Sequence, residues 1–348
     1  MNPALWITLG KILVVFALTL GTVAYMTLAE RKVSAIIQWR KGPNRVGIWG
    51  LLQPIADGLK FVFKEDYVPQ TANKALHALA PMLTMAPALM TFAVVPFGST
   101  LPIFGMEVKM IVADLSIGIL FIFAIASLGV YGLAVGGWSS NNKYSLLGGL
   151  RSSAQMISYE ISMGLSVIPI IMMSGTLMLT GIVDWQGNHL WFVITQPLSF
   201  LLFVISSFAE TNRLPFDLPE AEPELVGGFH TEYSSMKFAS FFLGEYANMI
   251  TASALIVTLF FGGYHLPFIE NLAFFDNHGF MLGMLHVITF MAKTAVWLFI
   301  FIWVRWSLPR FRYDQLMGLG WKVLLPLSLV NILIYGIIIL GFGLGGTS

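Results

Sequence analysis

Four ionisable side chains lie inside or beside long apolar stretches of the sequence: Glu160, Glu210, Glu245 and Lys293. A charged group in a lipid-like environment is costly, so such residues are functional candidates by default. A carboxylate in a dry interior either pairs with a cation or takes up a proton. The pattern favours proton handling by Glu160 and Glu245. For Lys293, a static ion pair with one of these acids is an equally good interpretation.

Two polar stripes accompany these charges at near-helical spacing. Asn248 and Thr251 follow Glu245, and His286 precedes Lys293 by two turns. Each set falls on one face of its helix. Both helices are therefore expected to carry polar groups into the protein interior.

The segment 206–233 contains many acids and a single arginine, Arg213. A run of acids is usually a solvated face. Here leucines and phenylalanines alternate with the acids, and three prolines prevent a long helix. Because crowded carboxylates cannot all stay ionised at neutral pH, some should share protons. The composition of this segment predicts a proton reservoir, which means a group of carboxyls that share and exchange protons. The alternative is an acidic face exposed to water. The acids of the segment are Glu210, Asp217, Glu220, Glu222, Glu224 and Glu232.

The composition is that of an integral membrane protein. Hydrophobic residues make up 57% of the 348 residues and charged residues 11%, with a mean hydropathy of +0.78, whereas soluble domains carry about 25% charged residues. The absence of cysteine excludes disulfides, thiolate-held Fe–S clusters and cysteine-ligated zinc, and no metal site is predicted. A net charge of +1 argues against nucleic-acid binding. Any electron transfer must use another chain's cofactor or a diffusible molecule.

Eight apolar stretches are long enough to cross a bilayer as helices, which takes about 20 residues each. They do not alternate apolar with polar residues, as barrel strands do. The prediction is an all-α integral membrane protein with a single membrane domain over residues 1–348. The predicted spans are 5–28, 77–97, 112–136, 157–180, 189–208, 238–262, 281–304 and 322–345.

Basic residues gather in alternate loops, which face the cytoplasm by the positive-inside rule. The opposite loops hold only Lys109. Both termini are therefore expected on the outer, periplasmic side, and the long inner loops 30–76 and 209–237 should form the docking face for a partner. The inner basic residues are Arg31, Lys32, Arg40, Lys41, Arg45, Lys60, Lys64, Lys74, Lys143, Arg151, Arg213, Lys237, Arg305, Arg310, Arg312 and Lys322.

An amphipathic helix is predicted within the first inner loop, over residues 48–64. A helix of this kind lies at the membrane surface. Two interpretations remain open. The helix is an interfacial helix with no further function, or it covers an opening of the protein on the lipid side. Its apolar face consists of Leu51, Leu52, Ile55, Leu59 and Val62, opposite Gln53, Asp57, Lys60 and Lys64.

Four long and irregular segments are distinctive: AERKVSAIIQWRKGPNRVGIWGLLQPIADGLKFVFKED (29–66), GWSSNNKYSLLGGLRSSAQMISYE (137–160), AETNRLPFDLPEAEPELVGGFHTEYS (209–234) and LPRFRYDQLMGLGWKVLLPL (308–327). Together they resemble the H subunit of respiratory complex I, the proton-translocating NADH:quinone oxidoreductase, which is called subunit 1 in mitochondria. The resemblance covers almost the whole chain, including the eight predicted spans.

This resemblance implies a subunit at the heel of the membrane arm, whose inner face docks the peripheral-arm subunits. Those partners carry FMN and the Fe–S clusters, so no redox centre is expected on this chain. With them, the chain would form the quinone chamber and its opening to the bilayer, beside small membrane subunits. Whether the quinone is ubiquinone or menaquinone stays open. The portal frame would be the amphipathic helix with the first and sixth spans.

The resemblance also implies roles for individual residues, none of them a covalent catalyst. The proton path would comprise Glu160, Glu210, Glu245, Asp217, Glu220, Glu222, Glu224 and Lys293, with the role of Lys293 the least defined. The quinone-binding residues would be Glu30, Arg31, Arg213, Phe216, Asp217 and Arg305.

Two other functions remain open. One is the homologous anchor subunit of a membrane-bound hydrogenase, although the segment 209–234 favours the quinone enzymes. The other is an independent ion-coupled transporter, a class that often shows inverted repeats, of which the sequence has no convincing pair. The chain length favours the bacterial inner membrane over the mitochondrial one.

Overall fold

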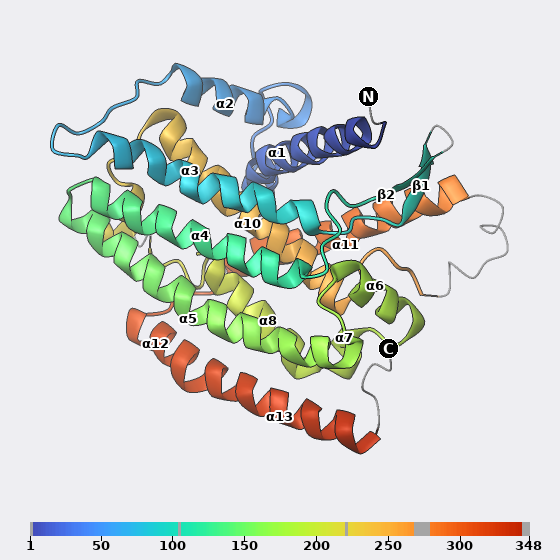
Figure 1. Ribbon diagram of the computed structural model, residues 1–348. Helices are drawn as coiled ribbons and strands as arrows, with labels where there is room; N and C mark the ends of the chain where they lie inside the picture. Colours follow the sequence, from blue (N-terminus) through green and yellow to red (C-terminus); the bar gives the residue numbers. More distant parts are fainter. Residues whose placement is uncertain (1–2, 104–105, 220–221, 268–278, 343–348) are drawn as a thin grey trace.

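The computed structural model describes residues 3–103, 106–219, 222–267 and 279–342, and within them it is a bundle of helices with one short hairpin (Figure 1). The helices are α1 (Pro3–Ile37), α2 (Gln53–Phe63), α3 (Lys74–Met90), α4 (Gly118–Ser139), α5 (Lys143–Ser174), α6 (Leu179–Asn188), α7 (Phe192–Thr195), α8 (Pro197–Glu210), α9 (Glu222–Leu225), α10 (Ser235–Phe260), α11 (Gly279–Ser307), α12 (Tyr313–Gly318) and α13 (Leu325–Phe342). The strands are β1 (Thr100–Ile103) and β2 (Met106–Lys109).

Seven helices of the described chain are long and apolar enough to cross a membrane. They correspond to all the predicted spans except 189–208. The seven are Trp6–Ile37, Lys74–Val94, Gly118–Ser139, Lys143–Ser174, Ser235–Phe260, Gly279–Ser307 and Tyr313–Gly341. The membrane character and the helical class are therefore confirmed, and a span count of eight stays a prediction.

The predicted span 189–208 is divided into the short helices α7 and α8. Gln196 separates them with φ −133° and ψ 58°, which are not helical angles. Because Pro197 follows, the backbone of Gln196 is disfavoured in the helical region. The buried amide of Gln196 donates a hydrogen bond to the Pro169 carbonyl, 3.1 Å away. Helix α8 has 14 residues, about 21 Å of length, against a hydrocarbon core of about 30 Å.

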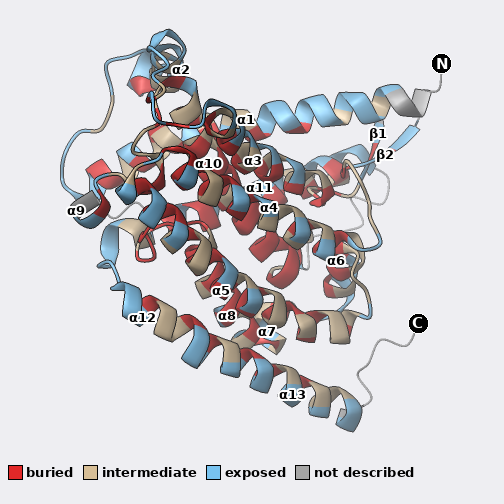
Figure 2. Ribbon diagram, turned by 60° about the vertical axis from the view of Figure 1, so that its left-hand side comes forward, coloured by how far each residue is buried: buried red, intermediate tan, exposed pale blue. Residues whose placement is uncertain are grey.

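The core of the bundle is formed around α10, most of which is buried (Figure 2). Helix α3 packs on α10 and on α4, and Gly132 of α4 allows the close approach of α4 to α3. A Cβ at Gly132 would lie 2.2 Å from the Thr84 hydroxyl oxygen, so only glycine fits there. Small residues at such crossings let helix backbones approach each other.

The two ends of the bundle differ in their connections (Figure 1). Helices α2 and α12 lie at one end, and the hairpin and α6 lie at the other. Helix α1 starts and α13 finishes at the hairpin end. The hairpin itself is antiparallel, with Thr100 opposite Lys109, and these two short strands were not predicted from the sequence.

The amphipathic helix predicted over 48–64 is confirmed as α2, preceded by a 3-10 turn at Ile48–Gly50. It packs on α1 and α10. Ile55, Leu59 and Val62 stay exposed on it. A short helix with this much exposed apolar surface needs lipid or a partner chain to cover it.

Candidate functional site

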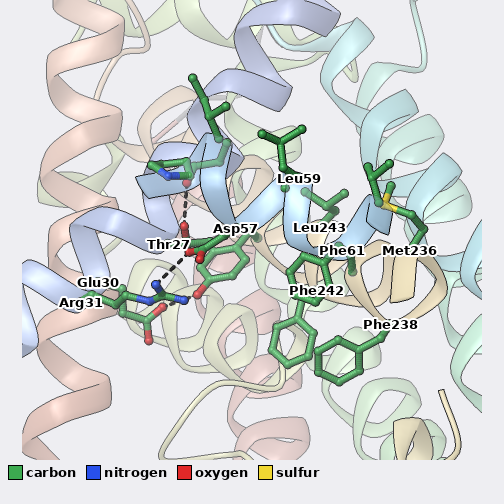
Figure 3. Close-up of a pocket in the computed structure, with 17 residues that line it drawn as sticks. Thr27, Glu30, Arg31, Asp57, Leu59, Phe61, Met236, Phe238, Phe242 and Leu243 are labelled. Carbon is green, nitrogen blue, oxygen red and sulfur yellow. Dashed lines mark hydrogen bonds and ion pairs between the residues drawn. The ribbon is translucent and has the colours of Figure 1, made fainter. Parts of the chain in front are cut away.

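A cavity of about 540 Å³ lies between α1, α2 and α10 (Figure 3). Most of its wall is apolar and comes from α2 and α10, including Leu59, Phe242 and Leu243. Polar groups are confined to one end, where Glu30 and Arg31 of α1 approach Asp57 of α2. A large apolar pocket with a few polar groups at one end suits an amphipathic ligand with a polar head and a hydrophobic tail.

Glu30 is the centre of a buried charge cluster behind this cavity. Its carboxylate accepts a hydrogen bond from the Tyr246 hydroxyl at 2.6 Å and pairs with Arg213 at 3.4 Å and with Arg305. Only 8% of the Glu30 side chain is exposed. The Arg213 guanidinium also lies 4.3 Å from the centre of the Tyr246 ring, a cation–π contact. Two guanidinium groups and one hydroxyl therefore surround the Glu30 carboxylate.

The rim of the cavity is held by a second, more exposed ion pair. Arg31 donates to the Asp57 carboxylate at 2.8 Å, and Gln53 donates to the other Asp57 oxygen at 3.0 Å. The Lys32 ammonium donates to the Trp49 carbonyl just before α2. These contacts join α2 to α1, so α2 forms a cover over the cavity, attached at its polar end.

The segment after α8 is organised by Gln155 of α5, which is fully buried. Its amide donates to the carbonyls of Ala209 at 2.8 Å and Phe216 at 2.7 Å, and it also lies 3.2 Å from the Asn212 side-chain oxygen. A buried backbone segment without regular structure needs such partners for its carbonyls. Gln155 therefore fixes the position of the acidic segment against α5.

Phe216 and Asp217 connect that segment to the chain after α11. The Phe216 ring packs 5.6 Å from the Tyr159 ring and 5.4 Å from the Phe311 ring. Asp217 accepts a hydrogen bond from Arg310 at 2.9 Å. Neither residue lines the cavity between α1, α2 and α10. Of the predicted quinone-binding residues, Glu30 and Arg31 line that cavity, and Arg213 and Arg305 contact Glu30 behind it.

The remaining acids of the segment are only partly described. Glu224 pairs with Arg151 of α5 at 2.7 Å, and Glu232 accepts a hydrogen bond from the Asn142 amide at 2.6 Å. Glu220 lies outside the described residues, as does the side chain of Glu222. Asp217 and Glu224 each face an arginine. The proton reservoir stays a prediction.

The three glutamates of the predicted proton path lie near the C-terminal end of α8, whose last residue is Glu210. Glu160 accepts a hydrogen bond from the Ser127 hydroxyl of α4 and lies near enough to Glu210 for the two carboxylates to repel each other. Glu210 and Glu245 line the same small cavity, of about 10 Å³. The structure therefore brings together residues 160, 210 and 245 from three helices, as an ordered proton path requires.

Lys293 lies elsewhere. Its ammonium donates to the carbonyls of Phe261, Gly263 and His265 at 2.7–2.9 Å and sits 4.6 Å from the centre of the Trp191 ring. These carbonyls follow the end of α10. Phe261 lies sixteen positions after Glu245, which corresponds to about 24 Å along a helix. A cation beside the last carbonyls of a helix is favourable. The ammonium is thus positioned to hold the end of α10.

Sequence reasoning missed Tyr246, Asp57 as a partner of Arg31, and Arg310. Tyr246 follows Glu245 directly, so it lies on a different face of α10 and was absent from the polar stripe of Glu245. No local pattern could have assigned it to Glu30, which lies 216 positions away in the chain. A tyrosine beside a buried acid is the only signal that the sequence offered.

Comparison with known proteins identifies the family. A family model described as NADH dehydrogenase matches residues 10–336. An H subunit of NADH-quinone oxidoreductase from Cytophaga hutchinsonii is 53% identical over 328 residues, which cover 94% of this chain and 95% of that protein. An H subunit from Geobacter metallireducens is 52% identical over 334 residues, covering 96% and 97%. The H subunit from Flavobacterium johnsoniae is 51% identical over 330 residues, covering 94% of each.

These matches extend over the helices that form the cavity, the charge cluster around Glu30 and the three glutamates. Because the family match and the relatives span almost the whole chain, the protein belongs to the NADH dehydrogenase family, among the H subunits of NADH-quinone oxidoreductase.

Proposed function

We propose that this chain is the membrane subunit through which quinone reaches the redox site of a proton-pumping NADH:quinone oxidoreductase. The cavity between α1, α2 and α10 is the portal: quinone slides head-first from the bilayer past α2. The observation that carries the proposal is the shape and polarity of this cavity, which is apolar along α2 and α10 and charged at Glu30 and Arg31.

The chemistry of the proposed ligand agrees with this wall. A quinone has a long apolar tail and a polar head with two carbonyl oxygens that accept hydrogen bonds. The tail would lie against Leu59, Phe242 and Leu243. Arg31, whose side chain is half exposed, is the donor at the polar end. The charge cluster of Glu30, Arg213 and Arg305 keeps that end of the portal polar.

Electrons come from partners in this proposal. The peripheral-arm subunits carry FMN and the Fe–S clusters, because the chain has no cysteine to hold a cluster. Quinone reduction takes two electrons and two protons, and the resulting change of charge alters the proton occupancy of the acidic segment. A change of one pKa unit corresponds to about 1.4 kcal/mol. Protons then pass along Glu210, Glu160 and Glu245 towards neighbouring membrane subunits.

The proposal includes an arrangement in the membrane. Helices α7 and α8 together form the eighth crossing, and both termini lie on the periplasmic side of the bacterial inner membrane. Two observations support this arrangement. Basic residues are concentrated in loops at the α2 end of the bundle, and α1 starts at the opposite end, where α13 finishes.

A matched pair of glycine substitutions tests the portal. A Cβ at Gly58, which lines the cavity, meets no atom within 4 Å, and the same holds for Gly10 at the far end of α1. Gly58→Trp therefore fills the cavity without a clash in the backbone, and Gly10→Trp adds the same bulk elsewhere. In the assembled enzyme, Gly58→Trp should raise the KM for quinone about tenfold, roughly the effect of 1.4 kcal/mol.

NADH oxidation by a soluble artificial acceptor provides the control measurement, because it does not require the portal. It should stay at the wild-type rate in both variants. Equal quinone kinetics for Gly58→Trp and Gly10→Trp would disprove the portal. Loss of NADH oxidation in both would instead indicate failed assembly, which a native gel detects independently.

A further inference from the structure

Two polar groups near the middle of the bundle line the same small cavities. Glu210 of α8 and Asn248 of α10 both line a cavity of about 20 Å³ between α8 and α10, and both also line the cavity of about 10 Å³ that contains Glu245. Asn248 is therefore part of the wall that the two cavities share. In the sequence, Asn248 stands out only through its place in the polar stripe of Glu245.

Within the described part of the chain, neither of these side chains makes a hydrogen bond to protein. Both residues are half-buried, and amides and carboxylates that are largely shielded from solvent almost always have a hydrogen-bond partner. An amide without one, facing a cavity, indicates a water molecule, since leaving it unpaired costs about 1–3 kcal/mol. A volume of about 20 Å³ exceeds the roughly 10–15 Å³ that one water needs.

The hydroxyl groups around the larger cavity offer only acceptors. Ser207 donates its hydrogen to the Phe203 carbonyl at 2.8 Å. Thr91 donates to the Ala88 carbonyl at 2.9 Å, so in its 3.2 Å contact with Thr251 the hydrogen comes from Thr251. Each hydroxyl carries a single hydrogen. Ser207 and Thr251 can therefore receive a hydrogen bond from a water but cannot give one.

When Glu210 is ionised, the Asn248 amide is therefore the side chain in the cavity wall that can donate a hydrogen bond. A water that donates to Ser207 or Thr251 and to the Glu210 carboxylate still needs a donor for its own oxygen. The NH₂ group of Asn248 supplies it. With three partners, such a water matches the usual coordination of buried waters.

We propose that the cavity between α8 and α10 binds a water molecule that links Asn248 to Glu210, and that Asn248 is the positioning residue for proton transfer at Glu210. The inference rests on the proposed proton path and adds its solvent site. Asn248 exchanges no proton itself. It orients the water so that the anion of Glu210 receives a hydrogen bond, and it joins this site to the cavity of Glu245.

Other titratable groups face the same region. Glu160 of α5 acts electrostatically on Glu210, and Glu245 lies across the second cavity. In the described residues, α3 contributes Thr84, the turn that follows α3 contributes Thr91, and α4 contributes apolar side chains to these walls. Donation through the water therefore opposes the repulsion that Glu160 exerts on an ionised Glu210.

Asn248→Leu tests the proposal in the assembled enzyme, reconstituted in vesicles. The substitution keeps the volume and removes the donor. Without the donor, Glu210 keeps its proton to higher pH, because a hydrogen bond to a charged form favours that form. The pH profile of proton pumping should move up by about one unit, which is about tenfold in rate on its acid side. The KM for quinone should not change.

Two further variants separate hydrogen bonding from packing. Asn248→Gln keeps the amide and should keep the wild-type profile. Ser253→Ala changes another buried polar residue of α10, whose hydroxyl bonds to the Met249 carbonyl of its own helix, and it should also leave the profile unchanged. Equal impairment by Asn248→Leu and Asn248→Gln, or no shift in Asn248→Leu, would overturn the proposal.

A density map of the complex in which ordered waters are visible gives a direct test. A peak within hydrogen-bond distance of Asn248 and Glu210 supports the site, and an empty cavity refutes it. The proton path itself fails in a different way: Glu210→Gln would then pump protons at the wild-type rate. If Glu210→Gln stops pumping while Asn248→Leu keeps the normal profile, only the water site is wrong.

Discussion

Two groups of buried carboxylates in this protein have opposite surroundings. Glu30 faces two arginines and a tyrosine hydroxyl. Glu210 faces serine and threonine oxygens, an amide and the repelling charge of Glu160. Opposite charges therefore surround Glu30. Among the described residues Glu210 has no cation as a partner, and the proposed function assigns it the proton that moves.

In the proposed function, this contrast separates a rigid electrostatic frame around Glu30 from a carboxyl, Glu210, that exchanges its proton. A buried ion pair is hard to break, because each partner left alone is an uncompensated charge. A carboxylate beside neutral acceptors changes its state at lower cost. The charge cluster around Glu30 should therefore govern assembly and stability, and Glu210 should govern pumping.

The largest expected effect is on stability, in Glu30→Ala. Removing the carboxylate leaves Arg213 and Arg305 without their shared partner, which should lower the free energy of unfolding by about 3–5 kcal/mol. Thermal unfolding of the purified complex and the amount of assembled enzyme measure this loss. Glu65→Ala, at an exposed carboxylate of the first inner loop, is the matched control. A wild-type melting temperature for Glu30→Ala would contradict the assignment of Glu30 to a rigid frame that is distinct from Glu210.

Glu210→Gln should affect function and leave the fold intact. Glutamine has nearly the same shape but cannot carry a proton, so pumping should fall about a hundredfold, the lower end of what positioned proton transfer contributes. Vesicle acidification driven by NADH measures the change, with the melting temperature as a check. Glu107→Gln on the exposed hairpin provides the control. A stable but pumping Glu210→Gln enzyme would contradict the assignment of Glu210 as the movable group.

Lys293→Met tests whether the Lys293 ammonium has a structural role, like the charge cluster around Glu30, or belongs to the proton path. Its hydrogen bonds to three carbonyls after α10 predict a structural role. Loss of these bonds should cost about 1–3 kcal/mol, with unchanged pumping per assembled complex. Lys322→Met, at an exposed lysine, should cost almost nothing. If Lys293→Met assembled normally but no longer pumped, Lys293 would join Glu210 in the movable group.

The smallest effect is expected at the rim of the cavity. Arg31 and Asp57 form an ion pair whose side chains are 51% and 25% exposed. Exposed pairs contribute about 0.2–1 kcal/mol. A double-mutant cycle with Arg31→Gln and Asp57→Asn should give a coupling energy in this range, and high salt should reduce it. A coupling energy as large as that of the Glu30 cluster would show that the rim is also part of the rigid frame.

Part of the candidate site could be predicted from the sequence. The amphipathic helix α2 follows from the periodicity of its apolar residues, which is visible in a linear sequence. The resemblance to the H subunit implied that α1, α2 and α10 frame an opening and that Glu160, Glu210 and Glu245 share one path; the structure has a cavity between those helices and brings these glutamates near one another. The prediction of 189–208 as one span was less accurate, because hydropathy does not register the helix break at Gln196.

Partners distant in the chain could not be predicted. Glu30 contacts Arg213 and Arg305, which lie 183 and 275 positions away. Lys293 was weighed as a partner of a buried acid, and no local pattern indicated that its ammonium donates to carbonyls after α10. Several arginines and acids were available to each group, and local spacing does not choose among them.

The sequence by itself determined that this protein resides in a membrane, which residues are charged within the apolar helices, and that any cluster must belong to another chain. Composition decides these points, because a chain with few charges and no thiols cannot cover a water-facing surface or ligate an Fe–S cluster. Only the tertiary structure decided which carboxylates are neutralised by arginine and which face a cavity. Helix packing brings distant side chains together, and the protonation of a buried acid depends on those neighbours.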